Sequence, residues 1–374
     1  MIIRPSAIVP EKTTIWLLPW ETKTISVQVL PEDAEDRTFT IKTNNNSATL
    51  TREGSTLRIT GRDFGDTEIT LTTNDGNKTA TITARVVSGA KVDMYLTDKN
   101  SAIFYLDTNN GVKDENIEKI YVDWGDGVEG KNFKKLENSR GIITTADLET
   151  NKTYTVTVYN SETIHFPQAS YNNNKNPIIK LYKIASPTRT SVYQLLYQQR
   201  NLTEIDSDAF VHLPNIIDGR SMLEYCTSLT ALPRSLFTGE TPVEDLRRAF
   251  WSSAINTLPK GFLQKATKLR DIDRMLGYCP ITDIEDGMLG ACNQTLQYIQ
   301  ATFTNCTLLT SDINKIFSAH SYPKMVSTHS AFYWSSVTGE GLRFIEKFGQ
   351  VNHTGTFAGC RQLSDYYQIP SDWK

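Results

Sequence analysis

The sequence lacks the concentrated positive charge that nucleic-acid binding needs. Its 374 residues contain 39 Lys and Arg against 42 Asp and Glu, a net charge of −3, and no run of like charge occurs. Because a protein that binds DNA or RNA normally shows a basic stripe, we expect no nucleic-acid partner. No apolar stretch approaches the length of a membrane span, so we also expect no membrane partner.

The first residues lack a secretory signal. Residues 1–6 have neither the charged n-region nor the continuous apolar core of a leader, and no cysteine lies nearby to carry a lipid anchor. We therefore expect Met1 to be the natural start. A methionine added to a trimmed chain is the alternative.

The patterns of common catalytic and metal sites are also missing. The five histidines show no zinc-ligand spacing, and neither a glycine-rich phosphate loop nor a Gly-x-Ser-x-Gly motif occurs. Carboxylate groups at Glu204/Asp206 and Asp283/Glu285/Asp286 could serve a glycosidase in principle, but they fall on the polar side of a repeat. We predict no enzyme, no catalytic residue, no metal and no cofactor.

What the sequence does have is an internal repeat over its second half. Apolar anchor residues recur 27, 27, 26, 27, 29 and 25 positions apart. The anchors are Leu196, Leu223, Phe250, Leu276, Phe303, Phe332 and Phe357. A period of this size indicates one small unit that cannot bury its own apolar face and stacks on its neighbours, so the pattern predicts a solenoid.

The clearest copy is Met222-Leu223-x-x-Cys226-x-x-Leu229-x-x-Leu232-Pro233. It resembles the leucine-rich-repeat superfamily, in the variant of surface proteins from anaerobic gut bacteria, over roughly residues 180–374. The resemblance implies α/β repeats. We expect Leu232 and Leu258 to point inward, so that replacing either with Ala costs about 2–5 kcal/mol.

One repeat position, three residues after the anchor, is small. It holds Cys226, Ser253, Cys279, Cys306, Ser335 and Cys360, and only Cys292 lies elsewhere. The cysteines form either a disulfide or metal set, or a series of small residues in a tight inner turn. Serine in the same position favours packing, and such thiols should react with a thiol reagent only after denaturation.

Residues 1–88 predict a β-sandwich. Apolar residues alternate within residues 25–29, 39–41, 57–59, 69–71 and 82–86. Turn-forming residues separate these stretches, which is typical of an all-β domain. The order Pro31-Glu32-Asp33-Ala34, Gly65-Asp66, Thr67–Leu71 and Asp75-Gly76 resembles the group 2 bacterial immunoglobulin-like domain, with Phe39 in place of that family's central tryptophan.

Residues 89–166 predict a second β-sandwich, with alternation within residues 92–96, 120–124 and 154–158. The run Val122-Asp123-Trp124-Gly125-Asp126-Gly127 resembles the polycystic-kidney-disease (PKD) type of immunoglobulin-like fold. The resemblance implies that Trp124 fills the core and that the glycines allow a tight turn. Asp123 and Asp126, with the loop Asp107–Gly111 nearby, could bind calcium, or they simply cap turns.

Two further features belong to the solenoid, residues 167–374. The Asn-rich stretch 170–177 leads into residues 178–182, which should cover its first coil, and Tyr366, Tyr367, Ile369-Pro370 and Trp373 should cover its last. Rings cluster just after the anchors, at Tyr197, Tyr225, Trp251, Tyr278, Tyr333 and Trp334. They either line up as an exposed binding ladder or wedge between coils as core, and we favour core.

The sequence thus predicts a mainly β protein with α/β repeats: two tandem immunoglobulin-like sandwiches followed by a leucine-rich-repeat solenoid. Such modules typically present a binding surface to other molecules. With no leader expected, they favour a bacteriophage virion protein, as a capsid decoration, head fibre or tail component, whose partners are other virion proteins and a host-surface glycan or protein. The alternatives are a bacterial surface adhesin whose leader is missing and, third, a glycan-active enzyme.

Overall fold

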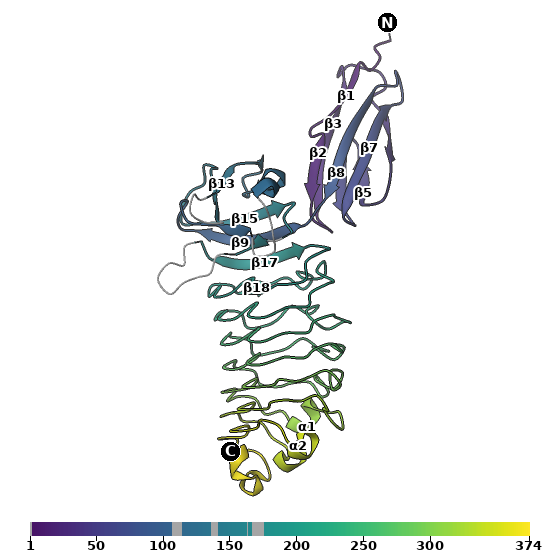
Figure 1. Cartoon of the computed structure of the whole chain (residues 1–374). Helices are drawn as coiled ribbons and strands as arrows, with labels where there is room; N and C mark the ends of the chain where they lie inside the picture. The colour runs from purple at the N-terminus through teal and green to yellow at the C-terminus, as the bar shows by residue number, and fades with distance from the viewer. Residues whose placement is uncertain (1, 107–113, 136–140, 163, 167–175) are drawn as a thin grey trace.

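The computed structural model describes residues 2–106, 114–135, 141–162, 164–166 and 176–374. The chain is elongated (Figure 1). A β-sandwich carries the N-terminus at one end, a second β unit follows, and a stack of coils leads to the C-terminus at the other end.

The N-terminal sandwich consists of two four-stranded, mainly antiparallel sheets that pack around a core of their own. Its strands are β1 (Ala7–Pro10), β2 (Thr14–Leu17), β3 (Thr22–Leu30), β4 (Phe39–Thr43), β5 (Ala48–Glu53), β6 (Thr56–Gly61), β7 (Gly65–Thr73) and β8 (Thr79–Val86). The sheet orders are β1-β3-β6-β5 and β2-β8-β7-β4. Strict alternation made β3, β4, β6, β7 and β8 predictable. Phe39 is buried in this core, where the sequence placed it.

The second β unit also has two sheets. Its strands are β9 (Gly89–Leu96), β10 (Phe104–Leu106), β11 (Tyr121–Asp123), β12 (Glu129–Gly130), β13 (Phe133–Lys135), β14 (Gly141–Thr144), β15 (Lys152–Tyr159) and β16 (Ile164–His165), with a 3-10 turn at Asp114–Lys119. Trp124 is fully buried against Phe104, with ring centroids 6.2 Å apart. Gly125 has a φ of +84°, and a Cβ there would lie 2.9 Å from the Thr155 carbonyl oxygen. The expected tight turn is therefore present.

No core boundary separates this second unit from the coils. Strand β17 (Ile178–Ala185) pairs antiparallel with β9 and parallel with β18 (Glu204–Ile205), giving the sheet order β12-β11-β15-β9-β17-β18. One continuous hydrophobic cluster runs from Ala90 to Trp373. The first coil thus rests on a sheet and does not expose its apolar end to water. Residues 170–175 of the expected leading stretch lie outside the described residues.

The coils stack through parallel backbone hydrogen bonds. Parallel bridges join Ser191, Asp218, Asp245, Asp271, Tyr298, Ser327 and Asn352 in succession. The N–H groups of Leu196, Leu223, Phe250, Leu276, Phe303 and Phe332 each donate to a carbonyl of the next coil. All seven anchors are fully buried, so they line one inner edge of the stack as their spacing predicts.

Each bonded segment consists of successive turns, so the coils differ from the expected α/β repeats. Alternate N–H groups bond to the next coil, while those between them bond three residues back, as Met222 N–H does to the Gly219 carbonyl. Among the described residues the α-helices are α1 (Ile313–Ile316) and α2 (Gly341–Phe348). Short 3-10 turns follow them at Tyr366–Gln368 and Ser371–Trp373. Most coils return through turns instead, such as the one in which the Leu236 N–H donates to the Pro233 carbonyl three residues back.

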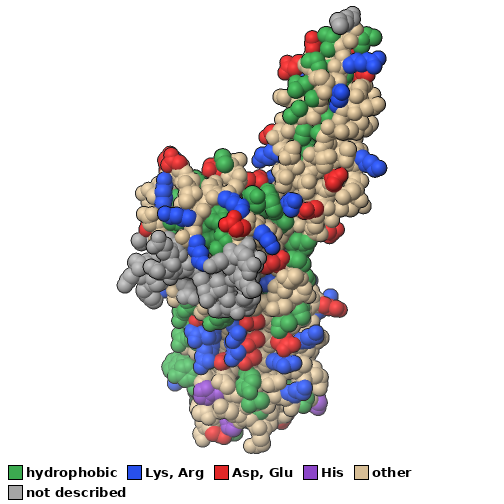
Figure 2. Space-filling view, turned by 45° about the horizontal axis from the view of Figure 1, so that its top comes forward, with side chains coloured by type: hydrophobic (Ala, Val, Ile, Leu, Met, Phe, Trp, Pro, Cys, Tyr) green, Lys and Arg blue, Asp and Glu red, His purple; other side chains and the backbone are tan. Residues whose placement is uncertain are grey.

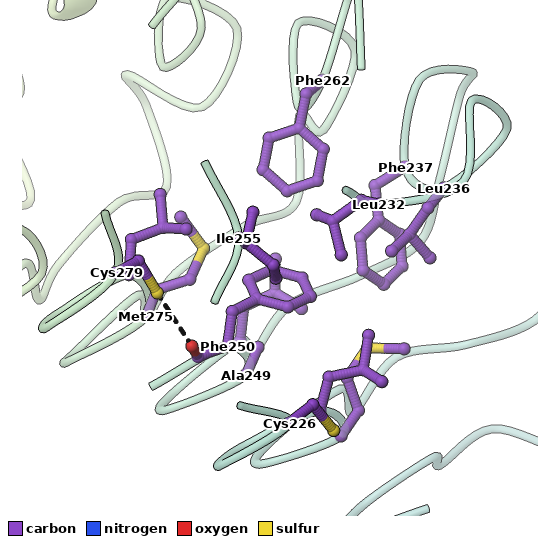
Figure 3. Close-up of a cluster of buried hydrophobic side chains, with 14 of the residues drawn as sticks. Cys226, Leu232, Leu236, Phe237, Ala249, Phe250, Ile255, Phe262, Met275 and Cys279 are labelled. Atoms are coloured by element: carbon purple, nitrogen blue, oxygen red, sulfur yellow. Dashed lines mark hydrogen bonds between the residues drawn. The ribbon is translucent and has the colours of Figure 1, made fainter. Parts of the chain in front are cut away.

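The small repeat position is a hydrogen-bond donor inside the core. All five cysteines are free and buried. The Cys279 Sγ donates to the Phe250 carbonyl at 3.0 Å (Figure 3), and Cys226, Ser253, Cys306, Ser335 and Cys360 make the equivalent bond to the previous anchor. Burial raises the pKa of the Cys279 thiol to about 12. Packing therefore explains this position, with a donor role that the sequence did not reveal.

The two leucines expected to point inward differ in burial. Leu232 is 7% exposed and joins the core cluster of Figure 3. Leu258 is only half-buried, beside a surface pocket of about 260 Å³ that Phe262 and Met288 also line. Leu258 still packs against the core, but its truncation removes less buried apolar area, so we expect it to cost less than that of Leu232.

The last coil is covered by the C-terminal residues. The Phe357 N–H donates to the Trp373 carbonyl, and Trp373 stacks on His353 with centroids 4.2 Å apart. Ile369 is 2% exposed, whereas Tyr367 is 85% exposed. Trp373 and Ile369 thus act as the expected cap, and Tyr367 does not.

Candidate binding face

The exposed side of the bonded segments forms one continuous surface, which we call the ladder face. It comprises the outward side chains of residues 191–199, 218–226, 245–253, 271–279, 298–306 and 327–335. Because parallel bonding holds each segment in register with the next, equivalent side chains form rows along the stack. In Figure 2, basic and acidic side chains stand next to one another on the surface of the coils.

A row of ion pairs crosses the coils at the N-terminal half of this face. Arg220 binds Asp218 of its own coil at 2.8 Å and lies 3.7 Å from Asp245 of the next. Arg247 repeats the arrangement, 2.7 Å from Asp245 and 3.5 Å from Asp271. Each arginine therefore bridges two coils, and the row is a network of linked charges, which is worth more than isolated surface pairs.

The acids of this row differ in their electrostatics. Burial acts to raise the pKa of Asp218, but hydrogen bonds from Arg220 outweigh it and lower that pKa. Asp271 receives less compensation, and burial raises its pKa to about 6. Burial also raises the pKa of Asp273, whose Oδ1 is buried and finds no hydrogen-bond partner among the described residues. The ionised carboxylate is thus least favoured at Asp271 and Asp273, at the C-terminal end of the row.

A second ion pair links the charged row to the rings. Glu224 is only 2% exposed, and its carboxylate accepts two hydrogen bonds from the Arg248 guanidinium. The same guanidinium lies 5.8 Å from the Trp251 ring centroid. Arg248 therefore satisfies a buried charge and supports an aromatic side chain at once.

The six candidate aromatic residues lie on this face, and the preference for core positions is wrong for the three that are exposed. Tyr278, Tyr333 and Trp334 are 52%, 39% and 57% exposed, and the other three are half-buried. The rings associate in edge-to-face pairs. These pairs are Tyr197 with Tyr225, Trp251 with Tyr278, and Tyr333 with Trp334, at centroid distances of 6.1, 4.9 and 6.3 Å.

Glycines in the following coil leave room for two of the rings. A Cβ on Gly277 would lie 2.3 Å from the Trp251 ring, and one on Gly359 would lie 3.1 Å from the Trp334 ring. Both tryptophans thus lie against bare backbone. Tyr193, which the sequence did not single out, adds a 41% exposed ring with the Arg220 guanidinium 5.0 Å from its centroid.

The calcium and glycosidase candidates have other structural roles. Asp123 and Asp126 accept backbone N–H bonds from Gly125 and Val128, as capped turns do. The loop Asp107–Gly111 lies outside the described residues. Within the described residues, no group of three His, Cys, Asp or Glu side chains could hold a metal ion.

The carboxylate groups near the repeats are likewise engaged. Glu204 and Asp206 both bind Lys180, at 2.7 and 3.0 Å. Asp283 accepts a bond from the Ser311 hydroxyl, and Glu285 accepts one from the Gly261 N–H. These side chains therefore link neighbouring coils. Asp283 and Glu285 also both line the surface pocket of about 260 Å³ beside Leu258, where each already accepts a hydrogen bond.

Residues at the junction of the two β units form a contact that sequence reasoning missed. Trp16 stacks on Tyr121 with centroids 4.4 Å apart, and Glu129 pairs with Lys23. The Glu21 carboxylate accepts bonds from the Leu18 N–H and the Tyr159 hydroxyl. Nothing in the local sequence marks these contacts, because Trp16, Lys23 and Glu21 find Tyr121, Glu129 and Tyr159 in the other unit.

Comparison with known proteins identifies the N-terminal sandwich. No curated protein matches the chain. In the described part of the structure, no helix is long and apolar enough to cross a bilayer. The comparisons do not support the PKD-like and leucine-rich-repeat resemblances, which stay predictions. Residues 4–84 match the bacterial Ig-like domain (group 2) family, so this module of the chain is an immunoglobulin-like domain of bacterial type.

Proposed function

We propose that the protein is a non-enzymatic structural and adhesive protein that binds a surface ligand through the ladder face. The observation that carries the proposal is the exposure of paired rings beside a charged network on a regular scaffold. Exposed aromatic and arginine side chains are the residue types that dominate binding energy at recognition surfaces. The bacterial Ig-like module is typical of surface and adhesion proteins.

The proposal includes the finer fold assignments. The parallel bonding of coils every 25–29 residues, with an apolar anchor in each, supports a leucine-rich-repeat type of solenoid. The buried Trp124 and the left-handed Gly125 and Gly127 support a PKD-like second sandwich. On this view the β units hold the solenoid away from the surface that carries the protein.

We further propose that this carrier is a bacteriophage particle, on which the protein decorates the capsid, forms a head fibre or belongs to the tail. Its partners would be other virion proteins at the sandwich end and a host-surface glycan or protein at the ladder face. The elongated arrangement, with the N-terminal sandwich at one end and the stack of coils at the other, supports this (Figure 1). The alternative carrier is a bacterial cell surface.

Two measurements test the proposal. Binding of fluorescently labelled full-length protein to intact bacterial cells should fall at least severalfold in the double variant Arg248→Ala/Trp251→Ala. It should be unchanged in Tyr367→Ala, which removes an exposed ring outside the ladder face. Equal binding by all three proteins contradicts an adhesive ladder face. Detection of the chain in purified virions or in a cell-envelope fraction decides between the two carriers.

A further inference from the structure

One outward position of the ladder face holds an aromatic ring in every second coil. Six residues occupy this position in successive coils, because each donates an equivalent backbone hydrogen bond to the next coil. The bonds run from Gln198 to Glu224, Tyr225 to Trp251, Ser252 to Gly277, Tyr278 to Thr304, Asn305 to Tyr333 and Trp334 to Ala358. The order along this row is therefore Gln, Tyr, Ser, Tyr, Asn, Trp. Rings alternate with small polar side chains that can hydrogen-bond.

The spacing of these rings follows from the backbone. Parallel hydrogen-bonded segments lie about 4.8 Å apart, so Tyr225, Tyr278 and Trp334 recur at intervals of about 9–10 Å. An extended β-1,4-linked polysaccharide turns successive sugar units over and repeats its orientation every two units, over a length close to this interval. One ring in every second coil thus matches one sugar face in every second unit.

The backbone conformation of this row does not favour aromatic residues. Tyr225, Tyr278 and Trp334 have φ values of +60°, +62° and +55°, in the left-handed region. That region costs a residue with a Cβ roughly 1–2 kcal/mol and suits Gly or Asn, which occupy this row at Asn305 and Gly359. Tyr278 and Trp334 remain more than half exposed, so burial offsets little of this cost. Gln198 and Ser252 in the same row share this conformation, so the coil imposes it whatever the side chain, and the rings stand where the backbone favours Gly or Asn.

The charge of the face limits the kind of polysaccharide. The arginines Arg220, Arg247, Arg248 and Arg274 are each paired with a carboxylate of the same face. No guanidinium in this set is left to neutralise a polyanion, while the paired groups still offer donors and acceptors to hydroxyls. The arrangement favours a neutral chain.

From these observations we infer that the ladder face binds a neutral, extended β-1,4-linked polysaccharide along the stack, with Tyr225, Tyr278 and Trp334 against alternate sugar units. Ser252 and Asn305 lie between the rings, Gln198 lies before the first of them, and all three bind hydroxyl groups of neighbouring units. This inference rests on the proposed adhesive function and names its ligand class.

The experiment measures retention of the full chain on insoluble chitin, cellulose, xylan and mannan, with starch as the α-linked control and heparin beads as the polyanion control. We expect retention on at least one β-1,4-linked polymer and none on starch or heparin. Tyr278→Ala/Trp334→Ala should weaken binding about tenfold or more, since two stacking contacts are lost. Tyr367→Ala should bind as the unmodified protein does.

A swap variant tests the spacing itself. Ser252→Tyr/Tyr278→Ser keeps the number of rings and moves one of them by one coil, between two left-handed positions with φ values of +55° and +62°. It should bind as weakly as Tyr278→Ala while melting at the same temperature as the unmodified protein. If the swap variant melts early, Tyr278→Ala alone, which adds no bulk, provides the comparison.

The outcomes separate this inference from the proposed function. Retention on none of the β-1,4-linked polymers, on starch equally, or on heparin alone overturns the inference, as does full binding by Tyr278→Ala. If binding to intact cells still depends on Arg248 and Trp251, the adhesive function stands and only the ligand class is wrong. If cell binding ignores the ladder face as well, both are wrong.

Discussion

Each coil closes on a side-chain hydrogen bond that only a small donor can make. The bond from Cys279 Sγ to the Phe250 carbonyl lies in a site where Cys279 is 1% exposed and Phe250 is fully buried. A larger side chain would overpack this turn, and an apolar one would leave the Phe250 carbonyl with only the Ser253 N–H as its donor. Cysteine and serine are therefore interchangeable here for a reason of hydrogen bonding as well as of size.

We predict that Cys279→Ala lowers the free energy of unfolding by about 1 kcal/mol, because it removes one of the two hydrogen bonds that the buried Phe250 carbonyl accepts. Cys279→Ser retains a donor of similar reach and should lose clearly less. Urea unfolding followed by circular dichroism measures both. Identical midpoints for the Ala and Ser variants would show that the hydrogen bond contributes nothing.

The ion-pair row predicts opposite pH responses at two equivalent aspartates. The pKa of Asp271 is about 6, above the value of about 3.9 in an unfolded chain. Between these values the folded state binds more protons. The contribution of Asp271 to stability is therefore largest below about pH 4 and is lost as pH rises through about 6. Asp271→Asn removes this penalty and should stabilise the protein at pH 7 by on the order of 1 kcal/mol.

Asp218→Asn is the matched control, two coils away in the same row of ion pairs. The pKa of Asp218 is lowered, so its contribution is present above the unfolded value and is lost as pH falls through the folded value. This variant should be less stable than the unmodified protein at pH 7, and the difference should shrink in acid. Unfolding free energies at pH 4 and pH 7 that moved in the same direction for both variants would contradict the assignment.

At the scale of the coil, the fit between Trp251 and Gly277 sets how one segment lies on the next. The ring occupies the space where a Gly277 Cβ would be, and it meets Tyr278 edge to face. The glycine is needed for this close approach, since its φ is not in the left-handed region. A ring and a glycine in adjacent coils therefore form one structural unit.

Gly277→Ala should destabilise the protein by about 1–3 kcal/mol, because the added methyl group displaces the Trp251 ring. In a Trp251→Ala background the same substitution should cost less, since the obstructing ring is gone. A double-mutant cycle of thermal or urea unfolding measures this coupling. Additive effects of the two substitutions would mean that the ring moves aside freely.

The sequence predicted the elements whose signal is local. Strict alternation marked strands such as β3 and β7, and the anchor spacing marked the coils. The left-handed backbone of the ladder face was not predictable, because Gln198, Arg248 and Tyr278 are not residues that signal positive φ. The ion-pair row did leave a signal: Asp218, Asp245 and Asp271 recur at the repeat spacing.

The candidate site was predicted in part for the same reason. The repeat located its rings but did not give their exposure, since an aromatic residue beside a buried anchor fits core and surface equally well. Exposure depends on the alternation of turn bonds within each segment, which only the structure reveals. The short strands β10, β12 and β16 were missed because two or three residues carry no periodicity.

At the scale of the whole molecule, the junction between the two β units decides how the N-terminal module projects from the rest. The Trp16–Tyr121 stack is flanked by cations, with Arg85 5.4 Å from the Trp16 ring and Lys131 5.8 Å from the Tyr121 ring. Trp20 also contacts His212 in the first coils, with centroids 4.5 Å apart. Because the N-terminal sandwich contacts both the second β unit and the first coils, these contacts favour one fixed orientation of that sandwich.

We predict that Trp16→Ala lets the N-terminal sandwich move relative to the second β unit without unfolding either unit. Trp16 is half-buried at the junction and lies outside the sandwich core. Small-angle X-ray scattering should show a broader distribution of interatomic distances for Trp16→Ala than for the unmodified protein. Trp16→Phe keeps a ring against Tyr121 and should scatter as the unmodified protein does. If Trp16→Ala leaves the distribution unchanged, the salt bridge of Lys23 with Glu129 and the contacts of Glu21 hold the orientation without the ring stack.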